Sequence, residues 1–198
     1  MPAYDYDRET ALVVVDVQND FADPNGNLYV GGGEDVVPVV NTEIARARSA
    51  GARVVYTADW HPGTSPHFAK DGGIWPVHCV GDTWGAAFHP NLIVDGPVVR
   101  KGTGGEDGYS GFSMRDPASD VVTETGLRDQ LERWGIRKIV VCGLATDYCI
   151  KATALDGADY GFEVTLFEDA MSAVDLEPGD GDKAIAEMRA VGCRVVSS

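Results

Sequence analysis

The chain has 198 residues, of which 44% are apolar, and this length and composition are typical of one α/β domain with a substantial core. With 16 Lys and Arg against 31 Asp and Glu, the formal net charge at pH 7 is −15. Phosphate backbones and anionic lipid surfaces would repel such a protein, so we expect neither a nucleic acid nor a membrane as a partner. The apolar runs ALVVVD and KIVVCGL exclude a disordered chain, because they require burial.

The termini and the cysteines predict a reducing compartment. The first ten residues, MPAYDYDRET, are polar and acidic, unlike a signal peptide. No apolar stretch approaches the roughly 18 residues that a transmembrane helix needs. The four cysteines form no CxxC pair, so we interpret them as reduced thiols in a cytoplasmic protein.

Near-continuous apolar segments predict six strands, and such strands suit a parallel sheet that is buried on both faces. The predicted strands are residues 11–16, 53–59, 98–100, 138–143, 163–168 and 193–196.

Helical spacing fills the intervals between these strands. A first helix is expected after a cap at Asp35, and a second carries Leu127, Leu131 and Trp134. A third runs from a cap at Thr146 to about Gly157, and the last is marked by Ile185, Met188 and Val191. This alternation predicts an α/β fold: a single doubly wound domain over residues 1–198, with a parallel six-stranded sheet and helices on both faces.

Ligands of doubly wound sheets bind beyond the carboxyl ends of the strands. That rule selects Asp16, Asp59, Lys101 and the loop after Gly143. The loops 17–34 and 60–97 are also unusually long, and long loops without periodicity in a compact domain are usually functional.

All four histidines lie in the second of these loops. Asp59 and His61 stand two residues apart at a strand end, where alternate side chains point to the same side, and His67 and His78 follow. Each histidine alone is more often a surface residue, but their clustering favours a metal site. Imidazole and carboxylate ligands suit one divalent ion such as Zn²⁺, Fe²⁺ or Mn²⁺. His89 has no partner at a useful spacing and is interpreted as structural.

Cys149 is a candidate nucleophile. With Thr146 as the cap, its thiol would lie in the first turn of a helix, where the dipole and free N–H groups favour a thiolate and can bind an oxyanion. A buried core thiol is an equally weighted interpretation at this point. Asp16 could accept the thiol proton, and Lys101 could keep Asp16 ionised, although each could also be a solvated surface charge.

Six segments in order resemble the nicotinamidase/pyrazinamidase branch of the isochorismatase-like cysteine hydrolases. They are VVVDVQNDF (13–21), ADWHP (58–62), WPVHC (75–79), VVRKG (98–102), YSGF (109–112) and GLATDYC (143–149). The resemblance runs from about residue 11 to residue 197. The segment TGGEDG, before Tyr109, and Tyr148, beside Cys149, stand where this pattern varies.

The resemblance implies a role for each matching residue. It implies a catalytic triad of Asp16, Lys101 and Cys149, and an oxyanion hole made by the N–H groups of Ala145 and Cys149 after a cis Leu144–Ala145 peptide. The implied metal ligands are Asp59, His61, His78 and, as in some members only, His67. The implied walls of a ring pocket are Phe21, Trp75 and Tyr109.

The implied reaction is the hydrolysis of nicotinamide to nicotinate and ammonia through a Cys thioester, with pyrazinamide as a second substrate and a place in NAD salvage. The implied cofactor is one divalent ion, Zn²⁺ first with Fe or Mn as alternatives, which binds the pyridine nitrogen. The family contains monomers and several assemblies, so a homo-oligomer is compatible with it. The alternatives are a hydrolase of another small amide (an N-carbamoyl compound, ureidoacrylate or maleamate) and a non-catalytic metal-binding domain.

Overall fold

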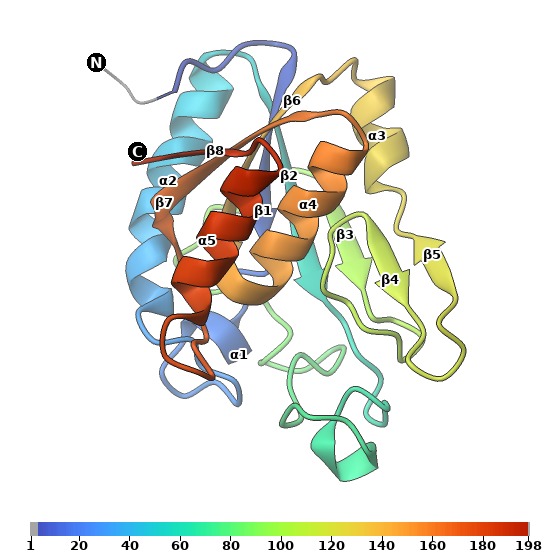
Figure 1. Cartoon of the computed structure of the whole chain (residues 1–198). Helices are drawn as coiled ribbons and strands as arrows, with labels where there is room; N and C mark the ends of the chain where they lie inside the picture. The colour runs from blue at the N-terminus through green and yellow to red at the C-terminus, as the bar shows by residue number, and fades with distance from the viewer. Residues whose placement is uncertain (1–3, 198) are drawn as a thin grey trace.

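A parallel six-stranded sheet forms the centre of the computed structural model, which describes residues 4–197 (Figure 1). The strand order is β3-β2-β1-β6-β7-β8, and every adjacent pair is parallel. This confirms the predicted α/β fold. The strands are β1 (Thr10–Val15), β2 (Arg53–Asp59), β3 (Val98–Lys101), β6 (Lys138–Leu144), β7 (Glu163–Ser172) and β8 (Arg194–Val196).

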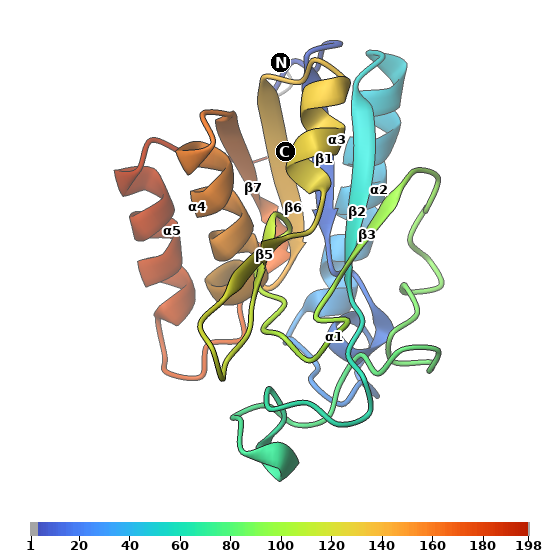
Figure 2. The ribbon, with the colours of Figure 1, turned by 90° about the vertical axis from the view of Figure 1, so that its right-hand side faces the viewer.

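Helices cover both faces of this sheet, as Figure 2 shows. The alternation of side chains along β1 defines the two cores. Leu12 and Val14 belong to the core under α2 (Gly33–Ser49), whereas Val13 and Val15 belong to the opposite core. That second core is covered by α3 (Leu127–Arg133), α4 (Lys151–Asp159) and α5 (Asp180–Ala190).

The two predicted helix caps are wrong. The first helix begins at Gly33, after Gly32 in a left-handed conformation with φ 78°, and Asp35 lies inside the first turn. A carboxylate is favoured there by the helix dipole without capping the helix. At the third helix the cap position belongs to extended Ala145, and Thr146 begins a π-helical turn, η2 (Thr146–Ile150), that precedes α4.

The last helix buries only part of the predicted face, since Met188 lies in the core and Ile185 packs against it. Val191 is 53% exposed at the end of α5, and Ile185 is only partly buried. The buried residues are Gly181, Ala184 and Met188, which are spaced three and four apart. Gly181 and Ala184 are small, so α5 can pack closely against its neighbours. The spacing of large apolar residues in the sequence does not reveal such positions.

Several short elements carry no periodic signal and were not predicted. The antiparallel hairpin of β4 (Ser113–Arg115) and β5 (Val122–Glu124) lies beside the main sheet, and the others are α1 (Asn19–Ala22) and the 3₁₀ turn η1 (Ala69–Asp71). Strand β7 also runs to Ser172, beyond its predicted end, past a register irregularity opposite β6. Among residues 4–197, no helix combines the length and apolar character that crossing a membrane requires.

Strands β1 and β6 approach each other closely at their carboxyl ends, through Gly143. This glycine has φ 116°, and a Cβ atom added to it would clash with the carbonyl oxygen of Val15. Only glycine accepts both conditions. The close approach brings Asp16, which follows β1, next to the turn that follows β6.

Candidate active site and metal centre

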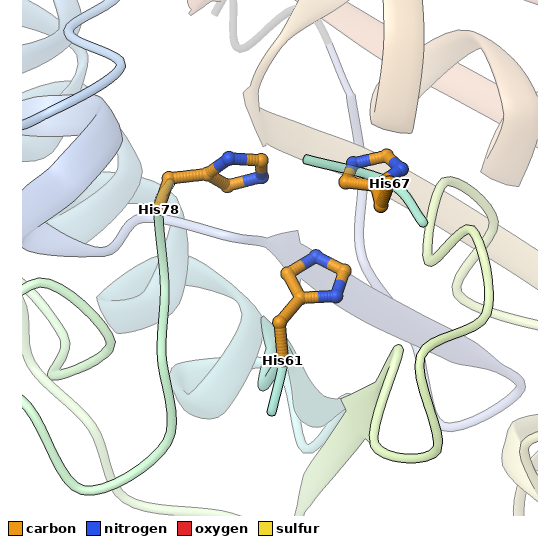
Figure 3. A group of neighbouring side chains, drawn as sticks. All are labelled: His61, His67 and His78. Atoms are coloured by element: carbon orange, nitrogen blue, oxygen red, sulfur yellow. The ribbon is translucent and has the colours of Figure 1, made fainter. Parts of the chain in front are cut away.

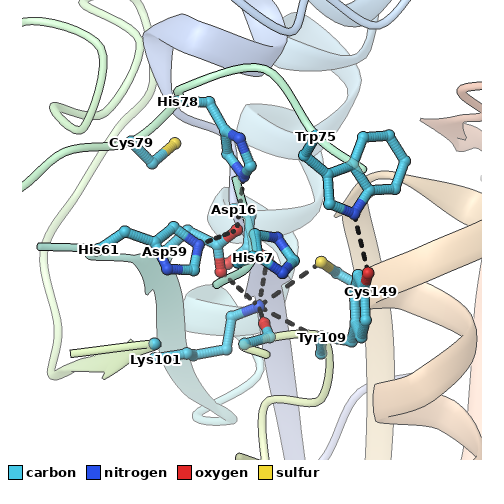
Figure 4. Close-up of polar contacts among 12 residues, drawn as sticks. Asp16, Asp59, His61, His67, Trp75, His78, Cys79, Lys101, Tyr109 and Cys149 are labelled. Atoms are coloured by element: carbon cyan, nitrogen blue, oxygen red, sulfur yellow. Dashed lines mark hydrogen bonds and ion pairs between the residues drawn. The ribbon is translucent and has the colours of Figure 1, made fainter. Parts of the chain in front are cut away.

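Lys101 lies at the centre of a buried charge cluster (Figure 4). Its Nζ atom is 2.7 Å from Oδ2 of Asp16, 2.9 Å from Oδ1 of Asp59 and 3.5 Å from Sγ of Cys149. The ammonium also donates to the carbonyl oxygens of Gly108 and Tyr109. The three residues of the expected triad therefore meet in the structure, with Lys101 between the two carboxylates and the thiol.

Burial controls the protonation of this cluster. Burial raises the pKa of Asp16 to about 6, although the Lys101 ammonium acts to lower it. Burial acts to lower the pKa of Lys101, but the two carboxylates outweigh it and the pKa stands well above its usual value. Burial also raises the pKa of Cys149 well above its usual value, against the opposing effect of Lys101. The structure thus favours a protonated thiol beside Asp16, although a position near the start of a helix favours the thiolate.

Hydrogen bonds hold both carboxylates in place. The Thr57 hydroxyl donates to Oδ1 of Asp16 at 2.6 Å. Gln18 is fully buried, and its amide brackets the backbone of Asp59: it accepts the Asp59 N–H and donates to the Asp59 carbonyl, both at 2.8 Å. The same amide donates to the carbonyl of Ala86. Gln18 therefore joins the end of β2 to the far end of the long loop.

The imidazoles of His61, His67 and His78 converge on one another, as Figure 3 shows, and the Asp59 carboxylate lies next to them. One ligand atom from each of His61, His67 and His78 lies within 4.8 Å of the others. Oδ2 of Asp59 is 3.7 Å from Nε2 of His61 and 3.8 Å from Nε2 of His78. His89 is outside this group and accepts the Asn91 N–H at Nδ1.

The chemistry of this cluster fits a divalent metal. Both ring nitrogens of His61 are buried and have no hydrogen-bond partner among the described residues, a costly state that coordination would relieve. Burial lowers the pKa of His78 to about 4, which favours the neutral imidazole that binds metals. Nδ1 of His78 is 2.7 Å from the carbonyl oxygen of Pro76. Because a carbonyl only accepts, this contact leaves Nε2 of His78 for a metal.

Backbone pairing and one aromatic ring bring the histidines together. The His61 N–H donates to the carbonyl of Cys79, and the Gly81 N–H donates to the carbonyl of His61, so the segment after His78 runs beside the end of β2. Phe68 is fully buried and contacts all three imidazoles, with ring centroids 5.5–6.3 Å away.

A pocket opens between the metal cluster and Cys149. Phe21, Trp75 and Tyr109, the three residues predicted to wall a ring pocket, all line it. The Trp75 indole N–H donates to the hydroxyl of Tyr109 at 2.8 Å. Tyr148 meets Trp75 edge-on, with 4.7 Å between centroids. The lining residues are Phe21, Leu28, Val30, Asp59, His67, Trp75, His78, Tyr109, Ala145, Tyr148, Cys149 and Val174. The Leu144–Ala145 peptide is cis, as the resemblance implies.

Some of these site residues were not predicted from the sequence. Gln18, Thr57 and Phe68 support the predicted residues without lying in the pocket, and Val174 lines it from the loop after β7. Gln18 did carry a signal, since an amide directly after a buried strand, inside VVVDVQNDF, has backbone groups to satisfy. Phe68 and Val174 look like ordinary core residues in the sequence.

Residues 10–198 match the isochorismatase domain. The chain belongs to the isochorismatase family. This isochorismatase-family chain is 36% identical over 200 residues to the nicotinamidase of Escherichia coli, with 92% of each chain covered. It is therefore similar to a nicotinamidase along nearly its whole length.

Two solved structures share the fold of this family member. The pyrazinamidase of Pyrococcus horikoshii in complex with zinc is 38% identical, with a TM-score of 0.84 over 96% of this chain and 99% of the other. The L. infantum protein PnC1 in complex with nicotinate is 34% identical, with a TM-score of 0.87 over 99% of this chain and 96% of the other.

Proposed function

We propose that the protein is a metal-dependent nicotinamidase, which hydrolyses nicotinamide to nicotinate and ammonia and also accepts pyrazinamide. One observation carries the proposal: a single aromatic pocket has the Cys149 thiol on one side and the His67 and His78 imidazoles on the other. A flat ring with an amide on one side and a ring nitrogen on the other matches this arrangement. The similarity to a nicotinamidase, to a zinc-bound pyrazinamidase and to a nicotinate complex supports it.

The reaction begins with a proton transfer from the Cys149 thiol to Asp16. The sulfur attacks the amide carbonyl carbon, and the carbonyl π electrons move to the oxygen, giving a tetrahedral oxyanion. The backbone N–H groups of Ala145, which precedes η2, and of Cys149, within η2, stabilise this oxyanion. Lys101 balances the negative charge that passes between the thiol and Asp16.

The intermediate collapses when its C–N bond breaks. Asp16 returns the proton to the leaving nitrogen, so ammonia departs and a thioester remains on Cys149. A water molecule then attacks the thioester while Asp16 takes its proton, the C–S bond breaks, and the released sulfur regains that proton. The carboxylic acid product ionises to nicotinate at neutral pH. Each proton that Asp16 accepts is thus passed on within the same half-reaction.

The ring is positioned by the opposite side of the pocket. Asp59, His61, His67 and His78 would hold the metal, zinc first with iron or manganese as alternatives. When bound, the metal supplies a Lewis-acid site for the ring nitrogen. The walls formed by Phe21, Trp75 and Tyr109 confine a planar ring, which keeps the amide carbon near the sulfur.

The decisive experiment measures ammonia release by the purified protein from nicotinamide, pyrazinamide and benzamide, which lacks the ring nitrogen. We expect turnover of the first two, much weaker turnover of benzamide, and none with Cys149→Ala. Full activity of Cys149→Ala would exclude the thioester, and equal turnover of benzamide would exclude recognition of the ring nitrogen.

The same assay separates the alternative functions. Turnover of an N-carbamoyl compound, ureidoacrylate or maleamate in place of nicotinamide would assign the protein to another branch of the family. No turnover of any amide by the metal-loaded protein would identify a non-catalytic metal-binding domain.

A further inference from the structure

Asp107, Gly108 and Tyr109 touch three separate parts of the site. Oδ1 of Asp107 is 2.8 Å from Nδ1 of His67. The carbonyl oxygens of Gly108 and Tyr109 accept hydrogen bonds from the Lys101 ammonium, and the Tyr109 hydroxyl accepts one from the indole of Trp75. One short segment therefore connects the metal cluster, the charge cluster and the ring pocket. It contains the end of TGGEDG, for which the mechanism above has no role.

The three clustered histidines differ in what holds their rings. His61 has no partner on either ring nitrogen, and His78 has the backbone carbonyl of Pro76. Asp59 lies 3.7 and 3.8 Å from Nε2 of His61 and of His78, whereas His67 has a carboxylate, that of Asp107, within hydrogen-bond distance of its Nδ1. An ionised carboxylate accepts and does not donate, so this contact puts the ring proton on Nδ1 and leaves Nε2 for coordination.

The Asp107 backbone is held in place independently of His67. The Asp107 N–H donates to the Arg115 carbonyl at 2.7 Å, and the Arg115 N–H donates back at 3.3 Å, so the backbone is fixed against β4. The Asp107 side chain is 27% exposed, whereas that of His67 is 4% exposed. The loop thus presents the carboxylate to the buried ring from the solvent side, and removing it leaves the backbone anchor intact.

We propose that Asp107 is a positioning residue that holds His67 in the tautomer with Nε2 directed at the metal, and so sets metal affinity. The proposal rests on the metal site of the proposed function.

The experiment compares zinc affinity, by competition with a chromophoric chelator, for the wild type, Asp107→Ala and Glu106→Gln. Glu106 is the adjacent acid, and its carboxylate accepts the Gly104 N–H, so Glu106→Gln removes the same charge without touching His67. We expect a dissociation constant about 10- to 100-fold higher for Asp107→Ala, and a wild-type value for Glu106→Gln. The ligand-field spectrum of the cobalt-loaded protein should change in Asp107→Ala only.

A double-mutant cycle tests whether Asp107 acts through His67. In a His67→Ala background, Asp107→Ala should cause no further loss of zinc affinity. An unchanged zinc affinity in Asp107→Ala, or an equal loss with and without His67, would overturn the proposal. Because zinc binding is measured without turnover, failure of this inference is distinguishable from failure of the nicotinamidase assignment, which shows as absent ammonia release.

Discussion

Asp59 and Lys101 form a buried ion pair, 2.9 Å long, at the boundary between the histidine cluster and the thiol. The other oxygen of the Asp59 carboxylate faces the imidazoles of His61 and His78. Burial acts to raise the pKa of Asp59, but Lys101 and His61 overcome it and hold the pKa well below its usual value. A single carboxylate therefore links the part of the site that would hold the ring to the part that would break the amide bond.

Replacing Lys101 should destabilise the fold as well as abolish activity. Lys101→Met keeps the length of the side chain but leaves Asp16 and Asp59 buried without a counter-charge. We expect a loss of about 3–5 kcal/mol in the free energy of unfolding, measured with urea. Lys183→Met is the control, because Lys183, which pairs with Asp180, is exposed. A loss for Lys101→Met no larger than that of the control would show that the two carboxylates do not depend on this ammonium.

Gln18 should be needed for the placement of Asp59. Gln18→Met conserves volume but leaves the N–H and carbonyl of Asp59 and the carbonyl of Ala86 without their partner. Each unsatisfied buried group costs about 1–3 kcal/mol, so urea unfolding should show a loss of several kcal/mol. Zinc affinity should fall with it. Gln130→Met, on α3, is the control. An equally small effect of the two variants would show that the hydrogen bonds of Gln18 do not hold Asp59 in place.

Gly143→Ala should destabilise the protein through a steric clash, in addition to the cost of its positive φ. Its Cβ would clash with Val15 in a residue with φ 116°. Gly161 also has a positive φ, 86°, but an added Cβ there meets nothing within 4 Å. Gly161→Ala should therefore cost only about 1 kcal/mol in thermal or urea unfolding. Gly143→Ala should lower the free energy of unfolding by clearly more than Gly161→Ala and should also lower ammonia release. Equal losses in the two variants would refute a close contact between β1 and β6.

The aromatic ring of Tyr148 should matter more than its hydroxyl. Tyr148 contacts Trp75 edge-on and lines the pocket. Tyr148→Ala removes this contact and should raise KM for nicotinamide about 3- to 10-fold, since such aromatic pairs contribute about 0.5–1.5 kcal/mol. Tyr148→Phe should keep the wild-type KM. Matching KM values for the Phe and Ala variants would assign the effect to the hydroxyl instead.

The sequence predicted the sheet and the residues at its carboxyl edge because those signals are local. Asp16 and Asp59 each close an apolar strand, and the rule that ligands bind at the carboxyl ends selects them without knowledge of the packing. The histidines were found for a similar reason, since they share one loop. The cytoplasmic location, the oligomeric state and a place in NAD salvage stay predictions.

The protonation of Cys149 could not be predicted, because it depends on contacts across the fold. A position near the start of a helix favours a thiolate, but full burial beside two carboxylates outweighs that effect. Gln18 and Asp107 are similar cases, since their partners lie 41 and 40 residues away. No spacing along the chain identifies which loop will meet which strand.

The strand order has a consequence for how this protein acquires its activity. Adjacent strands β1 and β6 come from opposite halves of the chain, so neither Asp16 nor Cys149 has its partner until the two halves have joined. Such distant pairing is slow to form and is complete only when the domain is. A complete chain that has not yet folded would hold every reactive group and yet no reactive site. Ammonia release during refolding should therefore report the last cooperative step of folding.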